Sequence, residues 1–219
     1  MLKSPANISG DLYTGAVVLK WQSGPGLAAL AVSGGGGHFG AMRQIDVLAP
    51  YGVTANLSAA FVTIDARGAW LFEGGGFYAK PTLDLILNYD RLGGFTEVGA
   101  GAIGSKSDGA DHTSFAAKPA IEFGYDYHQG DGTVLRPWLT AGAALRPDAT
   151  FALPVSFVGS IPAAGTYTIT TRVDKTAATV EGGLDIIKAG AYSFSLAYSG
   201  EFGQTYTRNG ARFKFSFPF

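Results

Sequence analysis

Few stretches of this sequence combine residue types and spacings that could do chemistry. Residues 99–104 match G-x-G-x-x-G, a pattern that cradles a dinucleotide phosphate when a strand precedes it and a helix follows it. The next residues, 105–109, read Ser-Lys-Ser-Asp-Gly and show no helical periodicity. We therefore interpret the glycine-rich segment as part of a flexible loop and predict no nucleotide cofactor.

Residues that could act as nucleophiles or metal ligands are equally sparse. Cysteine is absent, which excludes thiol chemistry, thiolate zinc sites and disulfides, and neither G-x-S-x-G nor H-E-x-x-H occurs. His38, His112 and His128 lie far apart in the sequence, so we interpret them as interfacial or solvated side chains. Asp108 and Asp111 could contact calcium from their glycine-rich loop, although such residues commonly form turns. The sequence therefore predicts no catalytic residue, no metal site and no enzymatic activity.

The composition favours a β protein. Lys and Arg number 16 against 17 Asp and Glu, and a net charge of −1 gives no attraction to nucleic acid. Glycine accounts for 32 of 219 residues, charged residues for only 15%, hydrophobic residues for 47% and aromatic residues for 13%. Disordered chains are poor in aromatics, and this much glycine weakens helices. The best apolar run, residues 27–32, is far shorter than the ~20 residues of a spanning helix, but a spanning strand needs only ~9–11.

Apolar and polar residues alternate with the period of a β-strand, most clearly at the C-terminus. Successive side chains of a strand point to opposite faces. One face of the terminal strand would carry Phe213, Phe215, Phe217 and Phe219. The opposite face would carry Arg212, Lys214 and Ser216. The segment is therefore predicted to have one apolar and one polar face.

The same alternation recurs upstream and predicts nine long strands. Their expected ranges are 11–21, 26–37, 56–72, 77–90, 113–127, 132–145, 174–187, 191–202 and 209–219. Residues 94–104 could add a short tenth piece. Tight glycine-rich turns alternate with long connections at 38–55, 91–112 and 146–173, so all long loops lie at one end of an up-and-down sheet. This arrangement is typical of transmembrane barrels, and the predicted fold is an all-β, antiparallel, up-and-down transmembrane β-barrel.

The polar face of the predicted strands carries charges of both signs. They belong to Arg136, Glu181, Asp185, Glu201, Arg212 and Lys214. Mixed charges suit a wet lumen better than a dry core. We therefore predict that these charged side chains face the lumen and form salt bridges that stiffen the barrel wall, while the terminal phenylalanines face lipid. Alternatively, the charged side chains could form the site of an outer-membrane enzyme. An interfacial girdle accounts more simply than ligand stacking for the aromatic residues Trp21, Tyr89, Tyr125, Tyr127, Tyr192 and Tyr198.

Several short stretches in the C-terminal two-thirds of the chain occur in an order found in one protein family. They are the proline-led strand at 81–89, Phe-Thr-Glu-Val-Gly-Ala at 95–100, Leu-Arg-Pro at 135–137, the end of the penultimate strand at 198–203 and the terminal Phe219. In this order they resemble the translocator barrel of the autotransporters, the type V secretion proteins of Gram-negative bacteria. The chain departs from that pattern at 144–147, where the family often has a Trp-x-His-Glu-Phe-like run. The departure bears on the subfamily rather than on the architecture.

The resemblance implies an outer-membrane barrel of twelve strands that anchors a passenger encoded upstream and enables its surface display or secretion. This chain would hold nine or ten of the twelve strands. With nine, three further strands would lie upstream together with the passenger, whereas ten strands could form a complete small barrel. A signal peptide should also lie upstream, since residues 1–10 have no apolar signal core. We expect residues 1–10 to be an extension and residues 11–219 to be the barrel domain. The resemblance also implies that the barrel-assembly machinery recognises the aromatic strand that ends at Phe219.

Two other functions stay open on the sequence alone. A stand-alone outer-membrane barrel of adhesin, porin-like or enzyme type would have a signal peptide directly upstream and no passenger. A soluble binding barrel would partition into buffer rather than into detergent.

Overall fold

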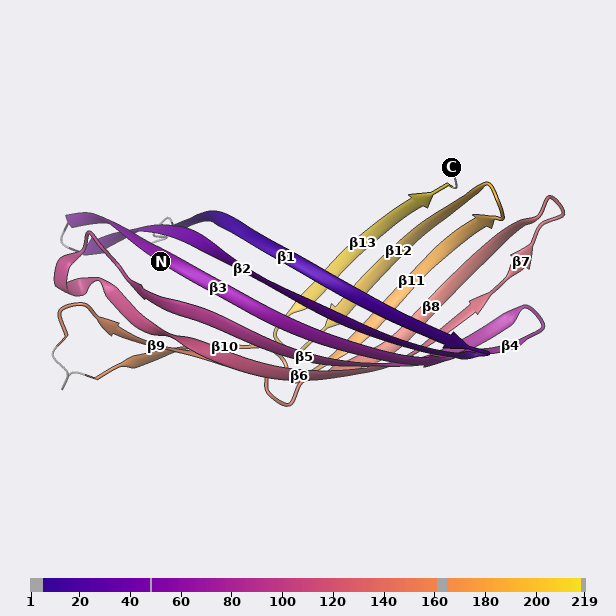
Figure 1. The fold of residues 1–219 in the computed structure, drawn as a ribbon, viewed down its shortest axis with the longest axis horizontal. Coiled ribbons are helices and arrows are strands. Elements are labelled where there is room, and N and C mark those ends of the chain that lie inside the picture. Colours follow the sequence, from indigo (N-terminus) through magenta and orange to yellow (C-terminus); the bar gives the residue numbers. More distant parts are fainter. Residues whose placement is uncertain (1–5, 48, 161–164, 218–219) are drawn as a thin grey trace.

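The chain forms one curled antiparallel β-sheet (Figure 1), described by a computed structural model over residues 6–47, 49–160 and 165–217. Nine long strands follow one another across the sheet in chain order. They are β1 (Ala6–Ser23), β2 (Gly26–Val47), β3 (Ala49–Trp70), β5 (Phe77–Thr96), β6 (Ser105–Tyr125), β8 (Thr133–Leu145), β11 (Thr176–Lys188), β12 (Tyr192–Phe202) and β13 (Thr207–Ser216). The predicted all-β, up-and-down antiparallel architecture is confirmed, as a half-barrel whose edges are β1 and β13.

Shorter elements decorate the two ends of this sheet. They are β4 (Phe72–Gly74), β7 (Tyr127–His128), β9 (Thr150–Phe157), β10 (Tyr167–Arg172) and the one-turn helix η1 (Gly101–Ile103). The tight turns use glycine where the backbone demands it: Gly75 and Gly76 connect β4 to β5 with φ of 61° and 85°, values that L side chains rarely adopt. No helix in the described residues has the length and apolarity needed to cross a bilayer.

The strands reach further toward the long-connection end than the sequence pattern predicted. The hairpin of β2 and β3 closes at Val47 and Ala49, so most of residues 38–55 is paired strand rather than loop. Residues 94–104 form no tenth strand, because Thr96 still belongs to β5 and η1 follows. Pairing continues because each strand satisfies the backbone groups of its neighbour. At the start of the chain, residues 6–10, expected in the extension, belong to β1 and pair with Phe39–Arg43 of β2.

The predicted surface loop at 146–173 contains a hairpin of β9 and β10. Its base is held by the Val173 N–H, which donates to the Ala149 carbonyl at 2.8 Å. Counting along the ladder from that pair, the backbone of Pro154 faces away from β10, so its missing N–H costs the hairpin no bond. The Pro154 carbonyl instead accepts a hydrogen bond from the Ser107 hydroxyl of β6 at 2.6 Å. Pro154 is therefore compatible with this strand.

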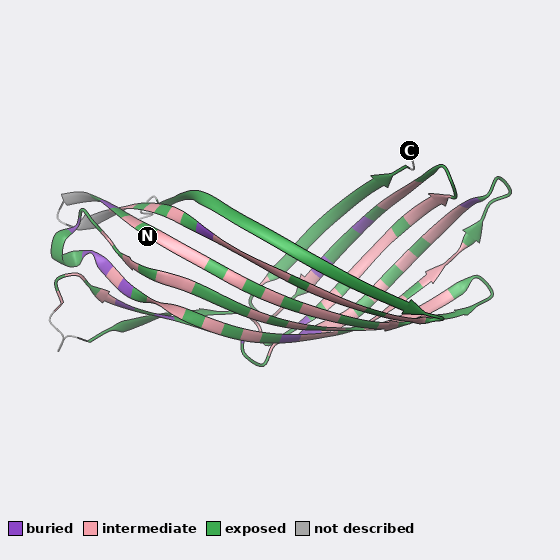
Figure 2. Ribbon diagram, viewed as in Figure 1, coloured by how far each residue is buried: buried purple, intermediate pink, exposed green. Residues whose placement is uncertain are grey.

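Burial is distributed unlike that of a globular core. Exposed and partly buried residues alternate along inner strands such as β5, as they do in a single sheet layer, whereas the edge strands β1 and β13 are exposed throughout (Figure 2). Among the described residues, the largest fully buried side chains are Val53 and Val155, in β3 and β9 near the long-connection end. The sheet itself encloses no dry interior of its own, so both of its faces must be considered as candidate functional surfaces.

Candidate functional site

The strand register divides the side chains between two faces. Residues opposite each other in an antiparallel ladder point to the same side of the sheet. Lys80 of β5 lies opposite Glu122 of β6, Glu122 opposite Thr140 of β8, and Thr140 opposite Glu181 of β11. These positions and their alternate neighbours define one face, which we call the polar face.

All of the charged residues predicted to face the lumen lie on the polar face. They are Arg136 and Asp185, which oppose each other, and Glu181, Glu201, Arg212 and Lys214. Phe213 and Phe215 lie on the opposite face of β13. Phe217 follows the end of that strand, with its ring centre 5.8 Å from that of Phe215, and Phe219 lies outside the described residues. The assignment of these faces to lumen and lipid stays a prediction.

The polar face is hollowed between β3 and β13. A cavity of about 500 Å³ is lined by side chains from both halves of the sheet, among them Arg67, Asp84, Glu122, Glu181 and Glu201. Two of the residues singled out from the sequence, Glu181 and Glu201, thus line the concavity. The polar face is therefore the inner face of the curled sheet.

Ion pairs cross from strand to strand on this face. Arg67 binds Asp84 with two hydrogen bonds of 2.5 and 2.7 Å between β3 and β5, and Lys80 binds Glu122 at 2.8 Å between β5 and β6. These cross-strand pairs were missed as site residues, although they follow the same alternation as the predicted ones. Several charges on the concave face are therefore paired across neighbouring strands.

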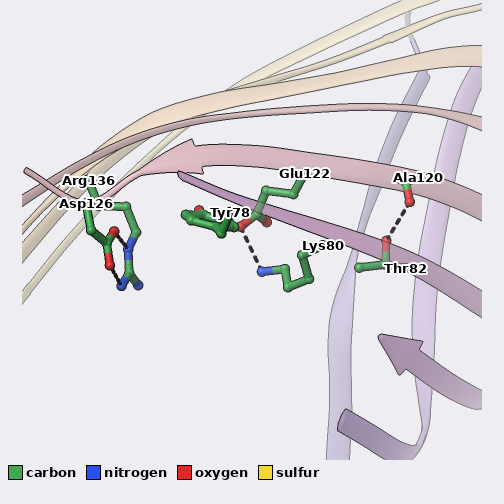
Figure 3. Close-up of polar contacts among 7 residues, drawn as sticks. All are labelled: Tyr78, Lys80, Thr82, Ala120, Glu122, Asp126 and Arg136. Carbon is green, nitrogen blue, oxygen red and sulfur yellow. Dashed lines mark hydrogen bonds and ion pairs between the residues drawn. The ribbon is translucent and has the colours of Figure 1, made fainter. Parts of the chain in front are cut away.

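Tyr78 lies between the Lys80–Glu122 ion pair and a further ion pair, Arg136–Asp126 (Figure 3). Its hydroxyl donates to Glu122 at 2.8 Å, and the Arg136 guanidinium carbon lies 5.6 Å from the centre of its ring. Arg136 forms its ion pair with Asp126, through bonds of 2.5 and 2.6 Å, rather than with the opposing Asp185. Asp126 lies in the break between β6 and β7, where the strand pattern gives no guide to side-chain direction.

Other predicted charges have looser or unexpected partners. Arg212 and Glu181 approach to 3.8 Å between β13 and β11. Glu201 binds Arg146 at 2.5 Å and also accepts from the Tyr206 hydroxyl. Because Arg146 lies between β8 and the β9–β10 hairpin, this cluster ties the connection at the base of the hairpin to the rim of the concave face.

The opposite face is apolar and uncovered. Phe213, Phe215 and Phe217 are 65%, 54% and 59% exposed. Exposed apolar side chains continue on this face from β1 to β12, among them Val17, Leu19, Val32, Val62, Leu83, Leu85, Phe123, Leu139 and Leu196. A soluble monomer rarely exposes an apolar patch larger than a few hundred Å². We call this surface the apolar face. An exposed apolar surface of this kind is normally in contact with lipid or with another protein.

Two polar clusters lie at the long-connection end of the sheet. Arg43 of β2 binds Glu97 with bonds of 2.6 and 2.7 Å, and the Ser105 N–H donates to the same carboxylate at 2.6 Å. The hydrogen bonds from Arg43, aided by that N–H, hold the pKa of Glu97 below its ordinary value. The backbone and hydroxyl of Thr205 likewise lower the pKa of Asp174.

The chemistry-bearing motifs of the sequence do not assemble into a centre. Residues 99–104 contain η1, and β6 rather than a helix follows, so this segment lacks the helix N-terminus of a dinucleotide site. Asp111 lies 3.8 Å from Arg91, and the His112 ring packs edge-on against Phe151. Within the described parts of the chain, no three histidine, aspartate or glutamate side chains gather as metal ligands would.

A curled up-and-down sheet with one uncovered apolar face and one charged concave face is the wall of a membrane-type β-barrel. A model of the autotransporter β-domain matches residues 3–199. The chain therefore belongs to the autotransporter β-domain family, whose members are translocator barrels of the outer membrane.

A solved structure has the same fold. The translocator domain of autotransporter NalP from Neisseria meningitidis superposes with a TM-score of 0.72 at 15% sequence identity, over 98% of this chain and 69% of that one. At that identity the similarity concerns the fold alone. No curated protein matches the sequence.

Proposed function

We propose that this chain is the membrane anchor and translocator of a passenger encoded upstream on the same polypeptide. The apolar face would contact outer-membrane lipid, and the polar face would line a water-filled lumen through which the passenger reaches the cell surface. Surface display is the physical role of the barrel, and no covalent chemistry by the described residues is required.

The observation that carries the proposal is the segregation of side chains between the two faces of the sheet, from which the edge strand β1 departs at Leu12 and Val18. Neighbouring positions such as Leu139 and Thr140 differ completely in environment: Leu139 is exposed on the apolar face, whereas Thr140 lines the cavity. In lipid, an exposed apolar face is favourable and a charged one is not. A stand-alone barrel would share this segregation, so the presence of a passenger rests on the family and on the experiment below.

Closure of the ring places a condition on the proposal. A sheet edge is not tolerated in lipid because its backbone groups would be unpaired. β1 and β13 both run from the long-connection end to the tight-turn end, so pairing them directly would be parallel. Antiparallel closure needs an odd number of additional strands between them, and we propose three, which gives the twelve strands implied by the family resemblance.

Expression of the complete gene, including its natural upstream region, in a Gram-negative host tests the function. The barrel should fractionate with the outer membrane, and upstream segments should become accessible to external protease on intact cells. Leu139→Arg should sharply reduce the folded barrel in the membrane, while the adjacent Thr140→Arg should be tolerated, since an arginine at the lipid midplane costs about 2–4 kcal/mol. A barrel that inserts while no upstream segment ever reaches the surface would refute the translocator role and favour a stand-alone barrel.

A further inference from the structure

The apolar face changes character toward the long-connection end of β1, β2 and β3. On this face of β1 the residues from Trp21 to Tyr13 are apolar, aromatic or glycine. They span nine residues, which matches the ~9–11 of a membrane-spanning strand. The next two positions on the same face, Asp11 and Ser9, are polar. The hydrocarbon boundary should therefore lie close to Tyr13, with Asp11 and Ser9 at the level of lipid headgroups.

Two ladder rows continue beyond this boundary, each with one residue from β1, β2 and β3. The first row is Asp11, His38 and Ser58, and the second is Ser9, Gly40 and Asn56. Opposing β-carbons in such a row are about 4.5–5.5 Å apart. The five polar side chains therefore form one continuous surface, which we call the polar patch.

The sheet is hollowed at the polar patch. The ladder between β3 and β5 ends at the pair Ala59 and Leu92, and beyond it only a single bridge joins Thr54 to Val98. Residues 55–58 of β3 are therefore outside that ladder, and a cavity of about 460 Å³ lies beside them. Its lining includes Ser9, His38, Gly40, Asn56, Ser58 and Gly94. The polar patch thus borders a space that can hold a ligand.

The side chains of the polar patch have no partner within the described parts of the protein. No hydrogen bond or ion pair joins any of the five to another group there. By contrast, charged side chains on the polar face, such as Arg67 and Lys80, are paired. Burying a polar group beside hydrocarbon costs free energy unless it is hydrogen-bonded. A ligand that offers both donors and acceptors would stabilise these groups.

The chemistry of the polar patch favours sugar hydroxyls over phosphate. Hydroxyl, amide and imidazole groups can both donate and accept, as sugar hydroxyls do. Among the described residues, no Lys or Arg lines the hollow, and the Asp11 carboxylate would repel a phosphate. Arg91, on the same face of β5, has the Asp111 carboxylate 3.8 Å away, so its charge is partly offset.

An aromatic ring and a shallow trough adjoin the polar patch on its lipid side. Tyr13 is 75% exposed and lies opposite Gly36, so no side chain of β2 stands opposite its ring. The slightly positive C–H groups of a sugar can pack on the negative face of such a ring. Closer to the tight-turn end, Gly15 lies opposite Gly34, and a β-carbon at Gly15 would meet nothing within 4 Å. This pair of glycines leaves room for an acyl chain.

We propose that the hollow binds the sugar headgroup of one glycolipid of the outer leaflet. The headgroup hydroxyls bond the polar patch, one sugar ring lies against Tyr13, and an acyl chain follows the trough at Gly15 and Gly34. A free sugar would leave the trough empty, and a phospholipid would place its phosphate beside Asp11. The inference rests on the proposed function, because it requires the apolar face in lipid and the long-connection end outside the cell.

Filling the hollow tests the proposal. Gly40→Trp fills it from the second ladder row, where an added β-carbon has only the Ser9 carbonyl oxygen within 4 Å, at 3.9 Å. Gly68→Trp is the matched control on the same face near the tight-turn end, since nothing lies within 4 Å of its β-carbon. The full-length protein is mixed in detergent with lipopolysaccharide of defined mass and analysed by native mass spectrometry. The unmodified protein and Gly68→Trp should retain one molecule, and Gly40→Trp should bind it on the order of tenfold more weakly.

A second variant separates sugar recognition from shape. Asn56→Leu combined with Ser58→Val removes two polar groups at similar side-chain volume, and it should weaken binding on the order of tenfold as well. Phosphatidic acid, which has acyl chains and a phosphate but no sugar, should not be retained by any variant. Equal retention of lipopolysaccharide by the unmodified protein and both hollow variants, or equal retention of phosphatidic acid, would overturn the glycolipid site.

The translocator function is measured separately, as exposure of the passenger to external protease on intact cells. Display should be unchanged in Gly40→Trp, and all variants should yield barrel that resists unfolding in unheated detergent. Loss of glycolipid selectivity with normal display would overturn the site and leave the translocator function intact. Selective binding by a protein that never displays a passenger would refute the translocator role and leave the site intact.

Discussion

The Tyr78 hydroxyl donates a hydrogen bond to Glu122 across the β5–β6 pair, and the Tyr78 ring lies directly on Gly124. A β-carbon at position 124 would overlap that ring. The glycine therefore makes room for a tyrosine that orients the Glu122 carboxylate toward Lys80, whose ammonium is 2.8 Å away. Packing and charge pairing on the concave face are coupled at this position.

Gly124→Val should consequently destabilise the barrel by about 1–3 kcal/mol, because the side chain must displace the Tyr78 ring and break its bond to Glu122. Gly68→Val, in β3, is the matched control, since nothing lies within 4 Å of its added β-carbon. Thermal unfolding in detergent micelles measures both. Equal unfolding temperatures for the two variants would contradict the coupling.

The Arg43–Glu97 pair should make the long-connection end sensitive to acid. The pKa of Glu97 is lower in the folded chain than in the unfolded one, so its stabilising effect is complete above the ordinary glutamate pKa. That effect is lost as the pH falls through the depressed folded-state value. Glu97→Gln should lose it at neutral pH as well.

Spin labels at Met42 and Val98, which are 61% and 67% exposed, can report this change in a chain without native cysteine. We expect a narrow distance distribution at neutral pH and a broad one in strong acid. The Glu97→Gln variant should be broad at both. A narrow distribution under all of these conditions would show that the pair does not hold this end together.

The two ends of the sheet should lie on opposite sides of the membrane. Gly165 and Gly190 both have positive φ, at 74° and 71°, and added β-carbons there meet no neighbour. A protease site inserted after Gly165, between β9 and β10, should be cut from outside intact cells, whereas one inserted after Gly190, between β11 and β12, should be protected. The reverse pattern would invert the topology.

Deletion of Phe219 should separate recognition from stability. If the assembly machinery recognises the terminal aromatic strand, the deletion should strongly reduce insertion in cells and leave refolding in micelles nearly normal, because recognition acts during insertion and not on the finished barrel. The comparison requires the full-length protein in both assays. A parallel fall in both, or no change in either, would rule out a recognition role.

The strands could be predicted because a sheet between two different environments imposes a period of two on its sequence. Arg212 and Phe213 illustrate this, as the structure places them on opposite faces of β13. The parts of β2 and β3 at the long-connection end could not be predicted, because residues 38–55 lose the clear alternation while their backbone pairing continues. Pairing depends on the neighbouring strand, which a single segment does not reveal.

The partners of the charged residues could not be predicted in the same way. The alternation of apolar and polar residues assigns Arg136 and Glu201 to a face of the sheet. It does not predict which oppositely charged residue each side chain binds. Arg136 turns to Asp126 at a break in the strand, and Glu201 binds Arg146 from a connection distant in sequence. Such choices depend on local backbone irregularities and on how connections fold back, neither of which has a periodic signal.

In the assembled barrel, the apolar face should meet lipid and the polar face should meet water. Spin labels placed singly at positions 212 to 216 of β13, in the full-length protein reconstituted into vesicles, test it most directly. Positions 213 and 215 should be accessible to oxygen dissolved in lipid, and positions 212, 214 and 216 to a water-soluble nickel reagent. Equal accessibility at odd and even positions would contradict a barrel wall between lipid and lumen.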